Sequence, residues 1–187
     1  MTAHTNTALV TPQNEFTFRS PNSRDGARVH QLISQCPPLD TNSLYCNLLQ
    51  CLHFADTSLI AEDNGLLAGF ISGYRLPQQP DTLFVWQVAV SEQARGKGLA
   101  SRMLLELLRR QHGAVKHLHT TITLNNNASW QTFRRLAASL NAPLNSQELF
   151  SREQHFAGAH DAEHLVHIGP FKLPHSGTSI RPLTTQE

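Results

Sequence analysis

The chain has 187 residues and a formal net charge of +1 at pH 7, with 40% hydrophobic and 16% charged residues. This near-neutral balance argues against a dedicated nucleic-acid surface, and no apolar stretch approaches the roughly 18 residues of a membrane helix. The start is too polar for a signal peptide, and three cysteines without a C-x-x-C pair are typical of a reducing cytoplasm. We expect one cytoplasmic domain over residues 15–172, between a disordered N-terminus, 1–14, and a loose C-terminal tail, 173–187.

A strand and two helices are predicted to open the domain. Residues 16–20 alternate as in a strand, and a helix with an apolar face follows as far as Pro37. The second helix lies within residues 39–54, where Asn42 or Ser43 is a suitable N-cap. Its leucines repeat at helical spacing, at positions 44, 48, 49 and 52.

A hairpin and a further strand are predicted next. Two apolar runs flank Asp63-Asn64-Gly65, which is a strong signal for a hairpin turn. A loop at 77–81, rich in proline and glutamine, then leads to an apolar strand over residues 82–90. A glycine-rich turn at 93–100 connects that strand to a helix over residues 101–111.

The last third of the chain adds a strand, a helix and a hairpin. The strand covers residues 117–124, and the helix over 125–141 has Trp130 at the start of its apolar face. The closing hairpin is predicted from residues 148–156 and 164–171. Strands and helices in this order predict a mixed α/β fold built on one layered sheet.

The glycine-rich turn is the most informative feature of the sequence. Gly96 and Gly98 let the backbone approach an anion closely, and the start of the following helix adds N–H groups and a positive dipole end. Such a turn suits a pyrophosphate. It lacks the third glycine and the acidic residue of dinucleotide folds, and also the Gly-Lys-Ser/Thr ending of the nucleotide hydrolases. A turn that only caps the helix is the alternative.

The pattern Gln93-x-x-Gly96-x-Gly98 after an apolar strand resembles the acyl-coenzyme A signature of the GCN5-related N-acetyltransferases. The resemblance implies that family's fold, a mixed, mostly antiparallel central sheet flanked by about four helices, and acetyl-CoA as co-substrate. In that family the fourth and fifth strands splay apart, and the pantetheine arm lies in the gap. The coenzyme-binding residues that it implies are Val88, Val90, Arg95, Gly96, Lys97, Gly98, Leu99, Ala100 and Asn126.

Three segments make the resemblance more specific. Residues 39–49, residues 85–90 with 95–104, and residues 125–137 are similar to the L-2,4-diaminobutyrate acetyltransferases of ectoine biosynthesis, a group within that family. This similarity implies acetyl transfer to the 4-amino group of a small-molecule diamine, by direct attack of the amine on the thioester. It also implies a homodimer.

An acceptor site for a diamino acid calls for acidic and aromatic side chains. Asp40 is our candidate for an ammonium contact, with helix capping as its other role. Trp86 lies on the strand that lines the acceptor site in the family, so it is a candidate for contact with the substrate or its cation, with core packing as the alternative. Tyr45 is a candidate catalytic residue whose hydroxyl reaches the substrate unless the ring packs in the core.

The usual catalytic acid–base residues of the family are missing. Many relatives have a glutamate base on the strand where this chain has Trp86 and Gln87, and Phe133 stands where the family's tyrosine acid is expected. A replacement base is predicted between residues 160 and 164, where Glu163 and His160 are the candidates. The alternatives are a surface or core role for His160 and a solvated turn position for Glu163.

The letters HDAEH at 160–164 also spell the H-x-x-E-H zinc-peptidase motif. That motif needs both histidines on one face of a long helix, whereas Gly158 precedes it and a strand-like run follows it. We therefore expect no metal.

Two other functions stay open on the sequence. One keeps acetyl-CoA and changes the acceptor to another small amine or a protein terminus. The other is a non-catalytic acyl-CoA sensor, which the missing glutamate and tyrosine suggest. A sensor would bind acetyl-CoA, but no amine would accelerate the release of thiol from acetyl-CoA.

Overall fold

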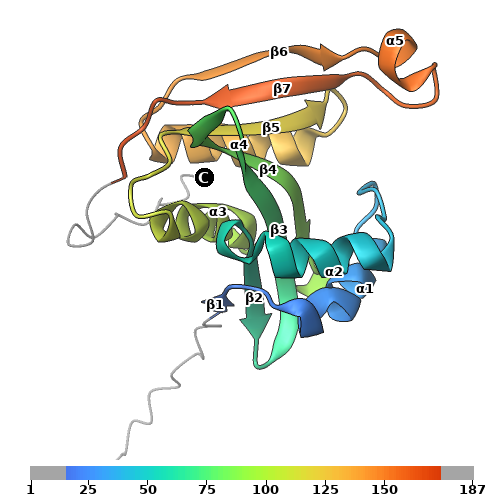
Figure 1. Ribbon diagram of the computed structural model, residues 1–187, viewed down its shortest axis with the longest axis vertical. Coiled ribbons are helices and arrows are strands. Elements are labelled where there is room, and N and C mark those ends of the chain that lie inside the picture. The colour runs from blue at the N-terminus through green and yellow to red at the C-terminus, as the bar shows by residue number, and fades with distance from the viewer. Residues whose placement is uncertain (1–15, 174–187) are drawn as a thin grey trace, which may run out of the picture.

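The computed structural model describes residues 16–173, which form a seven-stranded sheet flanked by helices (Figure 1). The strands lie in the order β1-β2-β3-β4-β5-β7-β6, and neighbours are antiparallel except β4 and β5, which are parallel. The mixed, mostly antiparallel sheet that we expected is confirmed. The strands are β1 (Thr17–Arg19), β2 (Leu59–Asp63), β3 (Leu66–Leu76), β4 (Gln79–Val90), β5 (His117–Thr123), β6 (Leu144–Phe150) and β7 (Glu163–Ile168). The α-helices are α1 (Gly26–Ser34), α2 (Leu44–His53), α3 (Leu99–Arg110), α4 (Asn127–Ser139) and α5 (Arg152–Phe156).

Alternating side chains give the sheet two apolar faces. On β2, Leu59 and Ala61 belong to the core that α3 and α4 cover, whereas Ile60 packs with residues of α1 and α2. On β3, Ile71 faces the first core and Phe70 the second. Helices therefore cover both faces, and Figure 1 places α1 and α2 together beside β2, β3 and β4.

The parallel pair of strands is joined only at its beginning. The register of β4 and β5 starts at Thr82 opposite His117 and ends at Phe84 opposite His119. Beyond these positions β4 and β5 are not paired with each other within the described residues, so the sheet opens between the carboxyl-terminal halves of these two strands. The splay of the fourth and fifth strands that the family resemblance implied is present.

The hairpin of β2 and β3 forms as predicted. Asn64 and Gly65 make its turn with φ values of 49° and 80°, the left-handed conformation that such a turn requires. The next connection is shorter than predicted. Leu76 pairs with Gln79, so a two-residue turn replaces the loop expected at 77–81.

The segment 148–156 is not one strand as predicted. It leaves β6 at Phe150 and continues as the short helix α5, which lies at the tip of the β6–β7 hairpin (Figure 1). The hydroxyl of Ser151 accepts a hydrogen bond from the backbone N–H of Gln154 at 3.2 Å and so caps α5. This local bond favours a helical turn over the strand alternation.

Helix α2 begins at the predicted cap but packs on an unexpected face. The hydroxyl of Ser43 accepts a hydrogen bond from the N–H of Cys46 at 3.1 Å. The fully buried side chains of α2 are Asn47, Gln50 and Cys51. Two members of the leucine repeat, Leu44 and Leu52, are 43% and 57% exposed, so the repeat does not mark the face that packs on the sheet.

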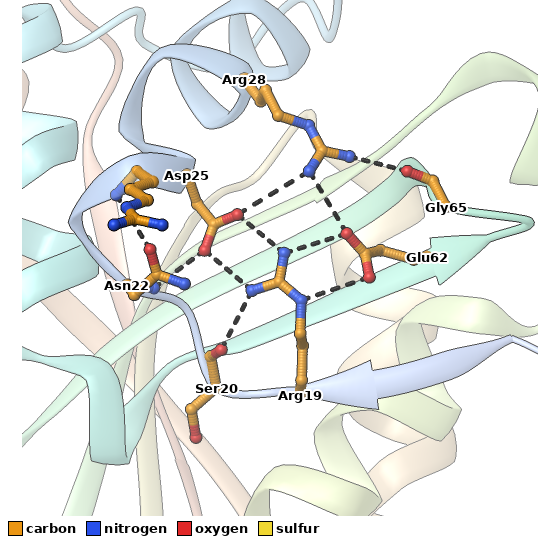
Figure 2. A network of polar contacts seen from close by, with 8 residues as sticks. Arg19, Ser20, Asn22, Asp25, Arg28, Glu62 and Gly65 are labelled. Carbon is orange, nitrogen blue, oxygen red and sulfur yellow. Dashed lines mark hydrogen bonds and ion pairs between the residues drawn. The ribbon is translucent and has the colours of Figure 1, made fainter.

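A charged network holds the edge strand β1 in place (Figure 2). The Arg19 guanidinium donates to both carboxylate oxygens of Asp25, at 2.8 and 2.7 Å, and to both of Glu62 on β2, at 3.2 and 2.9 Å. Arg28 of α1 also donates to Glu62, at 3.3 Å. Hydrogen bonding to Arg19 is the main cause that holds the pKa values of Asp25 and Glu62 below their usual range. The network thus joins β1, the start of α1 and β2.

The predictions for residues 1–14 and for the tail fall outside the described residues, apart from Leu173. The bounds of the domain, 15–172, stay a prediction. Within residues 16–173 no helix has both the length and the apolar character needed to cross a bilayer.

Candidate active site

The gap between β4 and β5 holds a cavity of about 550 Å³, which we call the acceptor cavity. The loop before α2, both splayed strands, the start of α4 and the α5–β7 segment all contribute to it. Its polar and aromatic lining residues include Asp40, Asn42, Trp86, Gln87, Thr121, Thr123, Asn125, Asn126, Arg152, His160, Asp161 and Glu163. Segments far apart in the sequence therefore meet where the sheet opens between β4 and β5.

A second cavity of about 340 Å³, which we call the coenzyme cavity, lies over the glycine-rich turn. Gly96 and Gly98 have φ values of 74° and 68°, and a Cβ added at either would meet no atom within 4 Å. The first turns of two helices, residues 99–101 of α3 and 128–129 of α4, line the same space. Two helix N-termini and open backbone at one site favour a bound anion, so the residues present fit a pyrophosphate.

The two cavities share Val88, Ser129 and Phe133 in their linings. Val88 belongs to the open half of β4, and the other two residues belong to α4. The cavities therefore meet between β4 and α4. A long ligand can extend from the glycine-rich turn to the acidic residues of the acceptor cavity.

The structure brings most of the predicted coenzyme residues to this region. Asn126 lines the acceptor cavity and caps α4, its side-chain oxygen accepting from the N–H of Ser129 at 3.1 Å. Lys97 is exposed and lines neither cavity. The predicted residues that line the coenzyme cavity are Val88, Val90, Arg95, Gly96, Gly98, Leu99 and Ala100.

Four of the five predicted acceptor-site residues meet in the acceptor cavity: Asp40, Trp86, His160 and Glu163. Tyr45 is 68% exposed on α2 and lines neither cavity, so its catalytic role stays a prediction. Among residues 16–173, no group of three His, Cys, Asp or Glu side chains is placed to hold a metal ion.

A bulge on β4 positions Trp86. Ser72 of β3 pairs with Gln87 and the next residue, Gly73, pairs with Val85, so Trp86 is an extra residue without a partner on β3. Bulges of this kind turn a side chain away from the regular alternation. Trp86 is 45% exposed and lines the acceptor cavity, which fits contact with a ligand better than core packing.

Glu163 has the electrostatic environment of a base. The side chain is half-buried at the start of β7, and its Oε2 atom is buried without a hydrogen-bond partner among the described residues. Burial raises the pKa of the Glu163 carboxyl and the nearby Asp40 carboxylate adds to the rise, against opposing effects from Thr121 and His160. A carboxylate with a raised pKa takes up a proton more readily.

Sequence reasoning missed two groups of residues. Gln87, considered only as an absent base, donates to the backbone oxygen of Asp40 at 2.8 Å and so holds the loop that carries the acidic side chain. Arg152 and Asn125 both bond to Asp161, at 3.0 and 3.2 Å. No motif marked these polar residues, because their neighbourhood arises only when the β6–β7 hairpin folds against the end of β5.

Comparison with known proteins agrees with this geometry. The model of the acetyltransferase (GNAT) family matches residues 27–138. The chain belongs to the acetyltransferase (GNAT) family. Because the match includes β4, the glycine-rich turn and most of α4, it covers the coenzyme cavity.

The chain is also similar to several L-2,4-diaminobutyric acid acetyltransferases. It is 54% identical to that of Methylotuvimicrobium alcaliphilum over 158 residues, which cover 84% of this chain and 92% of the relative. It is 50% identical to that of Halomonas elongata over 157 residues, which cover 83% and 81%. These relatives confirm the more specific resemblance drawn from the three sequence segments.

A solved structure with the same architecture is diaminobutyrate acetyltransferase EctA from Paenibacillus lautus, in complex with its substrate L-2,4-diaminobutyric acid and coenzyme A. The TM-score is 0.80 at 40% identity, and the alignment covers 86% of this chain and 98% of that one. A GNAT-family acetyltransferase from Streptococcus pneumoniae, with a TM-score of 0.60 and 17% identity, supports the fold alone.

Proposed function

We propose that this protein transfers the acetyl group of acetyl-CoA to the 4-amino group of L-2,4-diaminobutyrate. The observation that carries the proposal is the junction of the two cavities, where an anion-binding turn leads to a cavity lined by Asp40, Trp86 and Glu163. Identity of 54% to an L-2,4-diaminobutyric acid acetyltransferase over most of both chains supports the choice of substrate.

The first task of the site is to make the amine neutral. An alkylammonium has a pKa near 10.4, so its deprotonation at pH 7 costs roughly 4–5 kcal/mol, and the neighbouring 2-ammonium lowers that cost by repulsion. Glu163 is the base that removes this proton, because its raised pKa makes it a stronger base than an exposed carboxylate. His160, in the same cavity, is the alternative base.

The second task is to hold the diamine. Asp40 contacts an ammonium group, and the bond from Gln87 to its backbone keeps the loop in position. The exposed face of Trp86 provides a cation–π contact or a flat surface for the aliphatic chain. Both contacts select a cationic, unbranched acceptor.

The third task is to stabilise the charge that develops during attack. Acetyl-CoA supplies the acetyl group as a thioester, which the neutral amine attacks; the C–N bond forms and the C–S bond breaks. Because Glu163 already holds the first amine proton, the nitrogen gives its second proton to the released thiolate. Beyond Phe84, β4 has no strand partner on the side of the gap, so a backbone N–H at Val88 or Val90 is available to the carbonyl oxygen. Phe133 offers no proton to the sulfur, and a thiol pKa of about 8.5 lets the thiolate leave without an acid.

The test is thiol release from acetyl-CoA with L-2,4-diaminobutyrate, ornithine, lysine and 2,3-diaminopropionate as acceptors. We expect a strong preference for diaminobutyrate, and NMR of the product should place the acetyl group on nitrogen 4. Coenzyme binding without turnover of any amine would favour the sensor. Turnover of another amine, without turnover of diaminobutyrate, would mean that this other amine is the substrate.

Glu163→Gln tests the base directly. We expect kcat to fall by about 10²–10⁴-fold with little change in coenzyme affinity. Glu148→Gln, a change of the same kind at an exposed position on β6, is the matched control and should keep wild-type rates. If Glu163→Gln retains full activity, His160 or another group is the base.

We also propose that the protein is a cytoplasmic homodimer. The use of acetyl-CoA and the free thiols of Cys36, Cys46 and Cys51 support the cytoplasm. The edge strand β6 exposes Leu149 and Phe150, at 37% and 41%, which supports contact between two copies there. Light scattering should give a molar mass twice that of one chain, and Leu149→Asp should lower this mass towards that of one chain. A dimer that is unchanged by Leu149→Asp would mean that the two copies do not meet at β6.

A further inference from the structure

The acceptor cavity contains an unequal set of charges. Asp40, Asp161 and Glu163 are acidic, whereas Arg152 is the one arginine or lysine among the described residues that line it. A diamino acid brings two ammonium groups and one carboxylate. The acidic side chains match the ammonium groups, and a group that binds the carboxylate is still needed, because a buried charge without a partner is costly.

Arg152 is held in place but retains free donors. Its Nη1 donates to Oδ1 of Asp161 at 3.0 Å, while the other oxygen of Asp161 accepts from Asn125 at 3.2 Å. Its Nε lies 3.8 Å from Glu153, too far for a hydrogen bond. A guanidinium has five N–H donors, and within the described chain Nη2 donates to no other residue. A second carboxylate can therefore bind without displacing Asp161.

We propose that Arg152 binds the α-carboxylate of the amino-acid acceptor through its free guanidinium edge. The inference rests on the proposed function. It identifies the residue by which the site selects an amino acid over a simple diamine. Asp161 and Asn125 are positioning residues in this arrangement. They connect the guanidinium to the end of β5, so that it faces the same cavity as Glu163.

The experiment compares L-2,4-diaminobutyrate with 1,3-diaminopropane, which is the same molecule without its carboxylate. Binding of each to the protein saturated with coenzyme A is measured by calorimetry, and kcat and KM are measured with acetyl-CoA. For Arg152→Gln we expect affinity for diaminobutyrate to fall about 10- to 100-fold, mainly through KM, and affinity for diaminopropane to change less than about twofold.

Two controls separate binding from a structural role. Arg109→Gln removes a guanidinium from a surface ion pair on α3. The Arg109 side chain is 49% exposed, against 53% for Arg152, and its replacement should change the affinity for neither ligand. Asp161→Asn keeps the charge of Arg152 but breaks the ion pair that positions it, so it should lower the affinity for diaminobutyrate less than Arg152→Gln does and leave the affinity for diaminopropane nearly unchanged.

An equal loss for both ligands in Arg152→Gln, or no loss for either, would overturn the inference. The outcome is separable from that of the proposed function. Acetylation of diaminobutyrate that does not depend on Arg152 removes only the carboxylate contact. Binding that depends on Arg152 in a protein that acetylates no diamine removes only the catalytic proposal.

Discussion

Replacement of Gly98 by alanine separates the cost of a left-handed backbone from the loss of a ligand contact. Gly98 has a φ of 68°, where a side chain costs about 1–2 kcal/mol, and the stiffer unfolded chain returns about 0.5 kcal/mol of that. A net loss near 1 kcal/mol lowers the Tm of a chain of this size by about 2–4 °C. The added Cβ would meet no protein atom within 4 Å, so the fold itself makes room for it.

A bound pyrophosphate would occupy that open space. We expect Gly98→Ala to lose at least one charge-assisted hydrogen bond to the phosphate, about 1.5–3 kcal/mol, and so to raise the Kd for coenzyme A about 10- to 150-fold. Titration calorimetry gives the Kd, and scanning calorimetry gives the Tm.

Gly65→Ala is the matched control for this experiment. Gly65 has a φ of 80°, its added Cβ also meets nothing within 4 Å, and it lies in the turn between β2 and β3, away from both cavities. It should show the same fall in Tm with unchanged coenzyme affinity. Equal Kd values for the two variants would refute the assignment of the glycine-rich turn as the pyrophosphate site.

Three further predictions concern charge and stability. Asp40→Asn should move the acidic limb of the pH profile of kcat/KM to lower pH. The Asp40 carboxylate helps raise the pKa of Glu163, and activity is lost as the pH falls through that pKa. An unchanged limb would mean that a group other than Glu163 titrates there. Trp86→Leu should raise the KM for the diamine about 10-fold, in line with a contact of 1–2 kcal/mol, and leave the Kd for coenzyme A unchanged; steady-state kinetics and calorimetry decide between this and a packing role. Asp25→Asn should lower the free energy of unfolding in urea by about 2–3 kcal/mol. Glu106→Gln, which removes one partner of a partly exposed ion pair within α3, should lower it by less than about 0.5 kcal/mol. Since the pKa of Asp25 is lowered by folding, its stabilisation is present above the ordinary carboxyl pKa and lost as pH falls, so the variant should lose less stability in acid than the wild type.

The sequence predicts those parts of the fold that depend on local pattern. The turn at Asn64-Gly65, the Ser43 cap and the glycine-rich turn all lie where their residue types require them. Helix α5 was missed because one serine cap decides a five-residue helix, and such a short signal is lost in a segment that also alternates like a strand. The exposed leucines of α2 show that periodicity gives a helix an apolar face without saying what covers it.

The acceptor site was predictable residue by residue but not as an arrangement. Asp40, Trp86, His160 and Glu163 were selected by residue type and family resemblance, and the structure places all four in one cavity. Burial is the main cause that raises the pKa of Glu163, and the one charge that adds to the rise, Asp40, lies more than a hundred residues away in the chain. Only the folded sheet determines such long-range contacts, so Arg152 carried no signal in the sequence.

The short junction between β4 and β5 divides the sheet into two parts, which share one apolar core. Among residues 16–173, three residue pairs join β1–β4 to β5, β7 and β6, and no pair bonds the open halves of β4 and β5. Amide hydrogens of β5 that face the gap should therefore exchange faster than those of β3, through sub-global opening. Coenzyme in contact with both α3 and α4 would join the two parts, and it would slow this exchange in proportion to its saturation. The co-substrate would then stabilise the fold each time it binds during the catalytic cycle.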